Sequence, residues 1–277
     1  MRRFALALNM FVTANACALG GEPTAEDFFQ SGLEKLQSQR YDEAIADFTK
    51  AVELDEAFAD AYHKRGTAHF LKNDFANALV DYDRYLLINY LDANGFYDRA
   101  LCHEKLANRQ AAIADLGKCI SIKPRFANAL LKRGNCYADL ERLDSALADY
   151  TAYIEMRPAS DKGYYNRANV YKRLGEYENA YNDYQKVINV SPGVQDVYAS
   201  AGEMLVHLKR YTEALPLFQR AVKINAADAD AYYNIGLVYA TLGEQKKACE
   251  NFKRGAELNN ALAIEQYQNA CGKTNRE

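Results

Sequence analysis

The sequence of 277 residues is short of residues that end helices, and it lacks the motifs of common enzyme classes. It contains no Trp, only 5 Pro and 15 Gly, which favours helix along the whole chain. Six Cys occur, but no two form the C-x-x-C pair of zinc ribbons and thioredoxin-like proteins. No glycine-rich phosphate loop, His–Glu metal motif or nucleophile elbow is present. We therefore expect a protein that is not an enzyme, with no catalytic residues, metal, cofactor or small-molecule substrate.

The charge of the chain also excludes a class of partners. The formal net charge is −3, the pI is about 5.9, and no run of basic residues occurs. Binding to nucleic acid requires clustered cations that displace phosphate counterions, so we expect no nucleic-acid partner. Apolar residues make up 49% of the chain, which is enough to build a buried core.

The first 16 residues have the pattern of a secretory signal peptide. Arg2 and Arg3 precede a mostly apolar stretch over residues 4–14, and Ala-Asn-Ala follows at 14–16. A short cationic region, an apolar region and an A-x-A exit are typical of such signals. We therefore expect residues 1–16 to be removed and the protein to be exported to the periplasm, the cell envelope or the medium.

Two alternatives remain for this region. Cleavage after residue 16 would place Cys17 first, as in bacterial lipoproteins, although Ala14 stands where those signals usually carry a large aliphatic residue. Lipidation of Cys17 would then be the contact with a membrane. If the region is an ordinary N-terminal extension, the protein is cytoplasmic instead. Residues 17–24 contain two Gly and one Pro and are expected to form a linker.

The rest of the chain repeats with a fixed period. From Ala25 to Leu262 it divides, without insertion or deletion, into seven repeats of 34 residues. We number these repeats 1 to 7, and we call a position within a repeat a slot. The repeats span residues 25–58, 59–92, 93–126, 127–160, 161–194, 195–228 and 229–262.

Small and large residues recur at set slots. Slot 20 is always Ala, and slot 4 is always Phe, Tyr or Leu. Slot 8 is always small: Gly32, Gly66, Ala100, Gly134, Ala168, Gly202 and Gly236. Slot 24 is always large: Phe48, Tyr82, Leu116, Tyr150, Tyr184, Phe218 and Phe252. This spacing predicts two antiparallel helices per repeat, which approach closely at the small residues while the large residues fill the remaining space.

The pattern resembles the tetratricopeptide repeat over residues 25–262. The usual Trp at slot 4 is replaced by Tyr, Phe or Leu, and Pro at slot 32 occurs only as Pro124, Pro158 and Pro192. The resemblance implies an all-α fold, a right-handed superhelical solenoid of antiparallel helix hairpins. It also implies a solvating helix after the last repeat. We expect that capping helix and a tail over residues 263–277, with Ile264, Tyr267 and Cys271 on one face of the helix.

Arginine at slot 7 and aspartate at slot 23 occur together. Both are present in repeats 2 to 5, and both are absent from repeats 6 and 7. An arginine ladder of this kind would suit phosphate or acidic ligands. The joint disappearance instead favours structural ion pairs between neighbouring helices. The predicted pairs are Arg65 with Asp81, Arg99 with Asp115, Arg133 with Asp149, and Arg167 with Asp183.

Slots 2, 5, 9, 12 and 13 of the first helices lie away from the packed stripe, and the resemblance implies that they line a concave groove. Aromatic side chains next to amides suit a bound peptide, by stacking and by hydrogen bonds to its backbone. A groove that carries only solvent is the alternative. The predicted groove residues, centred on repeats 4 and 5, are Tyr97, Leu131, Asn135, Lys162, Tyr165, Asn169, Lys172 and Arg173.

A subfamily of these repeats binds the C-terminal carboxylate of chaperones through Lys, Asn and Arg. Asn135 and Asn166 match two slots of that clamp, but Leu131, Asp196 and Ser200 replace its cations. Chaperone tails are therefore disfavoured as ligands.

The His and Cys residues are expected to be structural. His69 and His103 share slot 11 with Tyr in other repeats, so we expect them to pack rather than to bind a ligand. If the protein is exported, Cys119 could pair with Cys136, or Cys249 with Cys271. Taken together, these features predict a scaffold that binds a protein or peptide, with a self-assembling homo-oligomer as the alternative.

Overall fold

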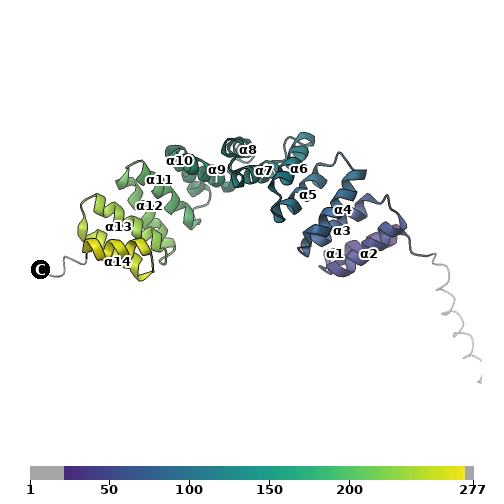
Figure 1. Ribbon diagram of the computed structural model, residues 1–277, viewed down its shortest axis with the longest axis horizontal. Coiled ribbons are helices and arrows are strands. Elements are labelled where there is room, and N and C mark those ends of the chain that lie inside the picture. The colour runs from purple at the N-terminus through teal and green to yellow at the C-terminus, as the bar shows by residue number, and fades with distance from the viewer. Residues whose placement is uncertain (1–21, 272–277) are drawn as a thin grey trace, which may run out of the picture. The chain divides into compact units, whose positions relative to one another are not determined.

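The computed structural model describes residues 22–271, and all secondary structure in that range is helical (Figure 1). The predicted signal peptide, Cys17, most of the linker and residues 272–277 of the tail lie outside the described residues. The chain divides after Ile122 into two compact units.

The N-terminal unit is a stack of three helix hairpins. Its helices are α1 (Ala25–Gln37), α2 (Tyr41–Leu54), α3 (Ala59–Leu71), α4 (Phe75–Ile88), α5 (Ala93–Lys105) and α6 (Arg109–Ile122). Within each repeat the first helix packs against the second, and α2 and α4 also pack against the hairpin that follows each of them.

The C-terminal unit contains four hairpins and a cap. Its first helices are α7 (Ala127–Asp139), α9 (Asp161–Leu174), α11 (Gln195–His207) and α13 (Ala229–Thr241). Their partners are α8 (Leu143–Met156), α10 (Tyr177–Val190), α12 (Tyr211–Ile224) and α14 (Gln245–Glu257). The cap comprises α15 (Ala261–Gln266) and a π-helical segment, η1 (Tyr267–Cys271). In both units the first helix of every repeat begins at slot 1.

The large residue at slot 24 lies directly on the small residue at slot 8. A Cβ atom added to Gly32 would lie 2.6 Å from the Phe48 ring, and one added to Gly236 would lie 2.5 Å from the Phe252 ring. Carbon atoms cannot approach so closely, so the two helices meet at a distance that only a small residue permits. Ala at slot 20 is fully buried in every repeat, which completes the close contact: Ala44, Ala78, Ala112, Ala146, Ala180, Ala214 and Ala248.

The turn inside each hairpin has a left-handed residue at slot 15. Gly175 and Gly243 occupy it in repeats 5 and 7, with φ of 76° and 79°. The other repeats place a residue with a side chain in the same conformation: Gln39, Asn73, Ala107, Glu141 and Lys209. Glycine adopts this region without the steric cost that a Cβ atom imposes. The sequence reveals the turn through its two glycines, but the geometry is common to all seven repeats.

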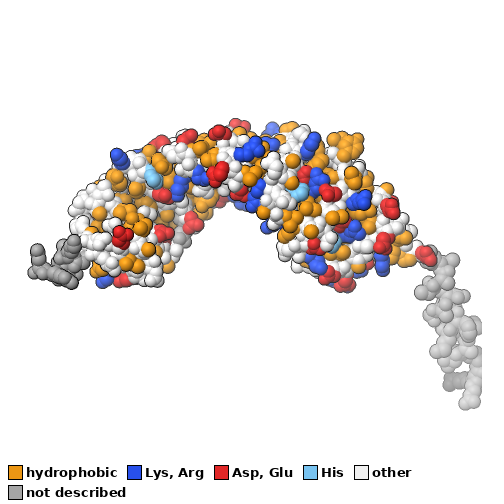
Figure 2. Space-filling model, viewed as in Figure 1, with side chains coloured by type: hydrophobic (Ala, Val, Ile, Leu, Met, Phe, Trp, Pro, Cys, Tyr) orange, Lys and Arg blue, Asp and Glu red, His pale blue; other side chains and the backbone are white. Residues whose placement is uncertain are grey.

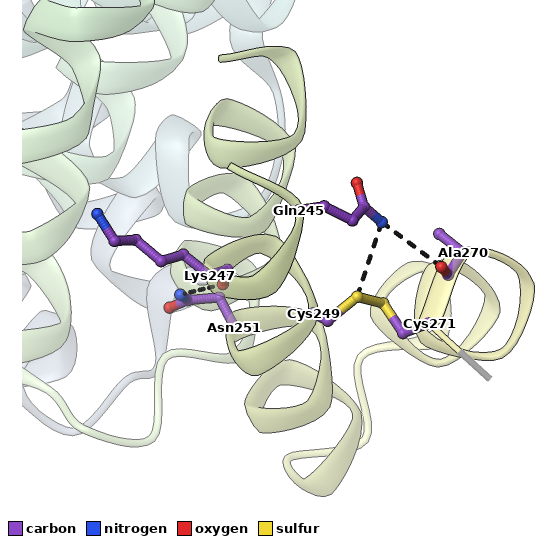
Figure 3. The surroundings of a disulfide bond; sticks show 6 residues. All are labelled: Gln245, Lys247, Cys249, Asn251, Ala270 and Cys271. Atoms are coloured by element: carbon purple, nitrogen blue, oxygen red, sulfur yellow. Dashed lines mark hydrogen bonds between the residues drawn. A yellow bond between two sulfur atoms is a disulfide. The ribbon is translucent and has the colours of Figure 1, made fainter. Parts of the chain in front are cut away.

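The cap is covalently attached to the last repeat. A disulfide joins Cys249 of α14 to Cys271 of η1 (Figure 3). The Asn260 side chain caps α15 by accepting a hydrogen bond from the Ala263 backbone N–H at 2.6 Å. α15 begins two residues before the expected boundary at 263.

The other proposed disulfide is wrong. Cys119 and Cys136 are buried thiols, as is Cys102. Burial raises the pKa of Cys102 to about 12, so this thiol stays protonated and unreactive at neutral pH.

None of the described helices is both long and apolar enough to cross a bilayer.

Substitution by alanine should have opposite effects on stability at a slot 15 glycine and at a glycine outside slot 15. Gly175→Ala is expected to lower the free energy of unfolding by about 1 kcal/mol, because alanine is strained at positive φ. Gly193→Ala is expected to raise the free energy of unfolding by about 0.5 kcal/mol. The φ of Gly193 is not positive, and the space around its Cα is open, so a methyl group fits there without strain. Urea denaturation of both variants measures the difference. Equal effects would show that slot 15 does not constrain the turn.

Candidate functional site

The slot 7 arginines face the slot 23 aspartates in all four predicted pairs. The shortest distances are 2.7 Å for Arg65–Asp81, 2.6 Å for Arg99–Asp115, 2.7 Å for Arg133–Asp149 and 2.7 Å for Arg167–Asp183. In each pair two guanidinium nitrogens donate to the two carboxylate oxygens, and the carboxylate is buried. The hydrogen bond to Asp115 raises the pKa of Arg99 above its ordinary value, so the guanidinium remains charged.

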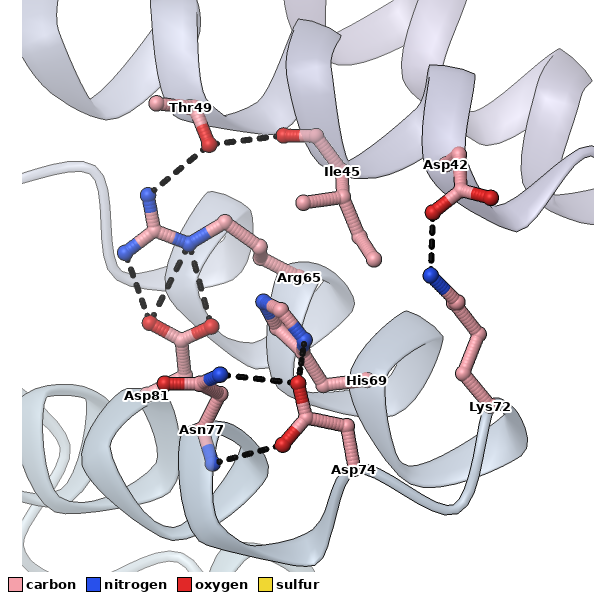
Figure 4. Close-up of polar contacts among 9 residues, drawn as sticks. All are labelled: Asp42, Ile45, Thr49, Arg65, His69, Lys72, Asp74, Asn77 and Asp81. Atoms are coloured by element: carbon pink, nitrogen blue, oxygen red, sulfur yellow. Dashed lines mark hydrogen bonds and ion pairs between the residues drawn. The ribbon is translucent and has the colours of Figure 1, made fainter.

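The same arginines also reach the preceding repeat. Arg65 donates to the Thr49 hydroxyl at 3.2 Å, as Figure 4 shows, and Arg167 donates to Thr151 at 3.0 Å. Arg99 pairs with Asp83 at 2.7 Å. All three acceptors stand at slot 25 of the repeat before. Each of these arginines therefore connects the two helices of its own hairpin and connects that hairpin to the preceding one. Its guanidinium N–H groups are used in these contacts and are not left to bind an external ligand.

Repeat 1 keeps the aspartate without the arginine. Slot 7 holds Ser31, and Lys35 from slot 11 lies 2.5 Å from Asp47 instead. Burial alone would raise the pKa of Asp47, but hydrogen bonds from Lys35 and Ser31 outweigh burial and lower it. The need for a cation beside this carboxylate is thus met from a different slot.

The slot 9 asparagines of repeats 4 and 5 are held by tyrosines from slot 24. The Tyr150 hydroxyl donates to Asn135 Oδ1 at 2.9 Å, and the Tyr184 hydroxyl donates to Asn169 Oδ1 at 2.6 Å. Asn166 Nδ2 donates to Asn135 Oδ1 as well, at 2.9 Å. Because both amide oxygens are occupied, the amide nitrogens of Asn135 and Asn169 are the groups left to donate.

Two tyrosines therefore join the candidate site, although the sequence did not predict this role for them. We assigned slot 24 only the role of filling space, yet Tyr150 and Tyr184 orient the asparagines through their hydroxyls. A signal for this was present. Repeats 4 and 5 combine Asn at slot 9 with Tyr at slot 24, whereas repeats 1, 3 and 7 combine Leu with Phe or Leu.

The cationic trio expected on α9 is largely neutralised. Lys172 Nζ lies 2.6 Å from Glu203 Oε2 on α11. Arg173 donates twice to the Ala138 carbonyl, at 3.0 Å each, and also pairs with Glu141. Lys162 is exposed and forms no ion pair among the described residues. Lys162 is therefore the cation of this trio that remains available to a ligand.

The remaining predicted groove residues divide between the units. Tyr165 is half-buried with its ring 6.0 Å from that of Tyr184, in an edge-on arrangement. Leu131 packs at the edge of the Tyr150 cluster. Tyr97 lies on α5 in the N-terminal unit, and burial raises the pKa of its hydroxyl. The face of the C-terminal unit formed by α7 and α9, which pack together, thus holds seven of the eight residues.

The two slot 11 histidines each lie beside a carboxylate. His69 Nδ1 is 3.1 Å from Asp74 Oδ2 (Figure 4), and His103 Nε2 is 3.8 Å from Asp115 Oδ2. Asp74 also caps α4 by accepting from the Asn77 backbone N–H. Within residues 22–271 no cluster of three or more His, Cys, Asp or Glu side chains could hold a metal ion.

Family models match most of the repeat region. A model described as TPR repeat matches residues 32–73 and 202–243. Models described as tetratricopeptide repeat match residues 85–161, 162–193 and 229–262. A search of the curated proteins finds no match to this chain.

Solved structures share the fold at low sequence identity. The C-terminal part of a TPR repeat-containing protein from Cytophaga hutchinsonii has a TM-score of 0.75 and 18% identity, covering 86% of this chain and 98% of that one. YrrB, described as a TPR protein with an unusual peptide-binding site, has a TM-score of 0.62 and 20% identity, covering 68% and 97%. MamA has a TM-score of 0.59 and 22% identity, covering 62% and 94%.

Removing one partner of an ion pair should destabilise the protein more than replacing both partners with uncharged residues. Arg167→Ala is expected to destabilise the protein by about 3 kcal/mol, because it leaves the buried Asp183 carboxylate without its partner. The double variant Arg167→Ala with Asp183→Leu introduces the residues of repeat 6, Ala201 and Leu217, and should recover most of that loss.

Denaturant unfolding of the two single variants and the double variant measures the coupling. The Thr151→Ala variant serves as a control, with an expected cost of about 1.5 kcal/mol from one hydrogen bond that the charged Arg167 guanidinium donates. A double variant as unstable as the sum of the single variants would contradict the pairing account.

Proposed function

Since the chain belongs to the tetratricopeptide-repeat family, we propose that it is a non-catalytic scaffold that binds an extended peptide of a partner protein. The observation that carries the proposal is the pair of asparagines at slot 9 of α7 and α9. Tyrosine hydroxyls occupy both amide oxygens and leave both amide nitrogens to donate. Equivalent donors on neighbouring repeats suit the carbonyl groups of an extended backbone.

The side chains around the asparagines support a mainly backbone-directed mode of binding. Tyr165 and Leu131 offer apolar surface beside the amides, and Lys162 offers one free cation. The other two cations of α9 are held by Glu203, Glu141 and a backbone carbonyl. A ligand recognised chiefly by charge would need those cations released. We therefore propose that apolar side chains and backbone carbonyls of the peptide, rather than acidic groups, determine its affinity.

Loss of the two amides should weaken peptide binding. Peptides would be selected from a random displayed library on the wild-type protein, and their dissociation constants would be measured by fluorescence anisotropy. Asn135→Ala with Asn169→Ala is expected to raise Kd at least tenfold, since each hydrogen bond contributes about 1 kcal/mol. Tyr184→Phe should weaken binding less, because it removes only the group that orients Asn169.

Asn182→Ala is the matched control, since Asn182 is exposed on α10, a second helix. Its Kd should equal that of the wild type. Unchanged binding by the double asparagine variant, or an equal loss in the control, would place the peptide elsewhere.

We also propose that the protein is exported. The cationic and apolar residues before Ala14, and the Ala-Asn-Ala exit at 14–16, support this. The Cys249–Cys271 disulfide supports it as well, because disulfides persist in oxidising compartments and are rare in the cytosol.

Export predicts a shortened protein. N-terminal sequencing of the protein recovered from the source cells should begin at Cys17, or be blocked there by a lipid. Ala14→Tyr with Ala16→Tyr should retain the first 16 residues, because signal cleavage requires small side chains at these positions. A wild-type protein that begins at Met1 or Arg2 would contradict the proposal.

A further inference from the structure

The outer face of α4 differs from that of every other second helix in the chain. At slot 22 it carries Val80, and at slot 29 it carries Leu87. Slot 22 elsewhere holds Ala46, Ala114, Ala148, Asn182, Pro216 and Glu250. Slot 29 elsewhere holds Glu53, Ser121, Glu155, Asn189, Lys223 and Glu257. The six other repeats show that the fold needs no large apolar residue at either slot.

The loop after α4 also carries large apolar residues that the other repeats lack. Slots 32 and 33 hold Tyr90 and Leu91, where other repeats place Pro, Gly, Ala or polar residues. Val80, Leu87, Tyr90 and Leu91 are 57%, 73%, 68% and 66% exposed. Hydrophobic side chains lie at the surface over α4 and the loop that follows it (Figure 2). Exposed apolar patches are a feature of protein interaction sites, and this one is absent from the equivalent surface of six repeats.

The exposed residues form one stripe along α4. Val80 and Leu87 are seven residues apart, which places them above one another on the helix. Asp83 and Arg84 lie between them and are also exposed. Ala76 and Asn77, small and exposed, precede the stripe on the same face. We call the stripe formed by residues 76, 77, 80, 83, 84, 87, 90 and 91 the α4 face.

The α4 face is complementary to itself. If two copies of α4 pack antiparallel about a twofold axis between residues 83 and 84, Val80 meets Leu87 of the other copy. Asp83 then meets Arg84, and the end of the stripe at small Ala76 faces the end of the other α4, where the loop with Tyr90 and Leu91 begins. Each contact occurs twice, as in an isologous interface. We propose that the α4 face binds the α4 face of a second copy of this chain.

The charges at the centre of the face retain groups that can make this contact. Arg84 is exposed and forms no ion pair in the described part of the chain. Asp83 Oδ1 accepts from Arg99 at 2.7 Å, which leaves Oδ2 for an arginine across the axis. Two opposite charges placed side by side fix the antiparallel direction, because a parallel pairing would bring like charges together.

The size of the patch sets the strength of the dimer. One helix face and one loop cover a few hundred Å² per copy, below the roughly 800 Å² per partner of a standard interface. The dimer is therefore weak and forms as the protein concentration rises. The α4 face belongs to the N-terminal unit, so dimerisation does not use the asparagines of α7 and α9.

Sedimentation velocity of the full chain over a range of concentrations tests the proposal. The wild type should shift from monomer to dimer as concentration rises. Leu87→Glu should weaken the dimer at least tenfold, and it should fold, because three other repeats carry Glu at slot 29. Arg84→Glu should weaken it as well, since the introduced carboxylate would face Asp83 of the other copy, whereas Arg84→Lys should retain it.

Leu71→Glu is the matched control. Leu71 is an exposed leucine of the same unit, 48% exposed on α3 and outside the α4 face, so its substitution should leave the dimer unchanged. Thermal unfolding of each variant confirms that it is folded. A wild-type protein that stays monomeric at all concentrations would overturn the proposal. So would a dimer that Leu87→Glu leaves intact.

Discussion

The contact between the large side chain at slot 24 and the small residue at slot 8 determines how each hairpin is built. The ring of Phe48 or Phe252 lies so close to the partner glycine that no larger residue fits there without displacement. In repeats 4 and 5 the same side chain also prepares the candidate site. The ring of Tyr150 packs on Gly134, while its hydroxyl holds Asn135. Core packing and the orientation of the asparagine amides thus depend on one residue.

The ion pairs add a second connection between neighbouring hairpins. Three of the four slot 7 arginines bind the aspartate of their own repeat and a side chain at slot 25 of the repeat before. In a repeat array the stability depends on each repeat and on its contacts with its neighbours. Repeats 6 and 7 replace these pairs with uncharged residues. At that end of the chain the disulfide between α14 and η1 ties the cap to the last repeat instead.

Much of the fold could be predicted because the sequence repeats every 34 residues. Each residue can therefore be compared with the six residues at the same slot of the other repeats. The helix starts and the Arg–Asp partners follow from such comparisons. Contacts that change from repeat to repeat could not be found in this way. Slot 25 is Thr in Thr49 and Thr151 but Asp in Asp83, so no constant residue type marks it as the second partner of arginine.

Individual features of the candidate site were out of reach for a related reason. The pairing of Lys172 with Glu203 joins two slots that carry other residues elsewhere, so the sequence showed two charges but not their contact. Left-handed backbone at Ala107 or Lys209 has no sequence signal, because the fold imposes it on residues that do not favour it. The role of Tyr184 required the hydroxyl to be placed beside Asn169, which only the packed hairpin shows.

The central claim is that the side-chain amide nitrogens of Asn135 and Asn169 bind the partner. Nuclear magnetic resonance of the labelled side-chain NH2 groups tests it most directly, during titration with a peptide selected on the wild-type protein. The account predicts that the Asn135 and Asn169 signals shift with the bound fraction while that of Asn182 stays in place. Saturating peptide that leaves the Asn135 and Asn169 signals unmoved would contradict it.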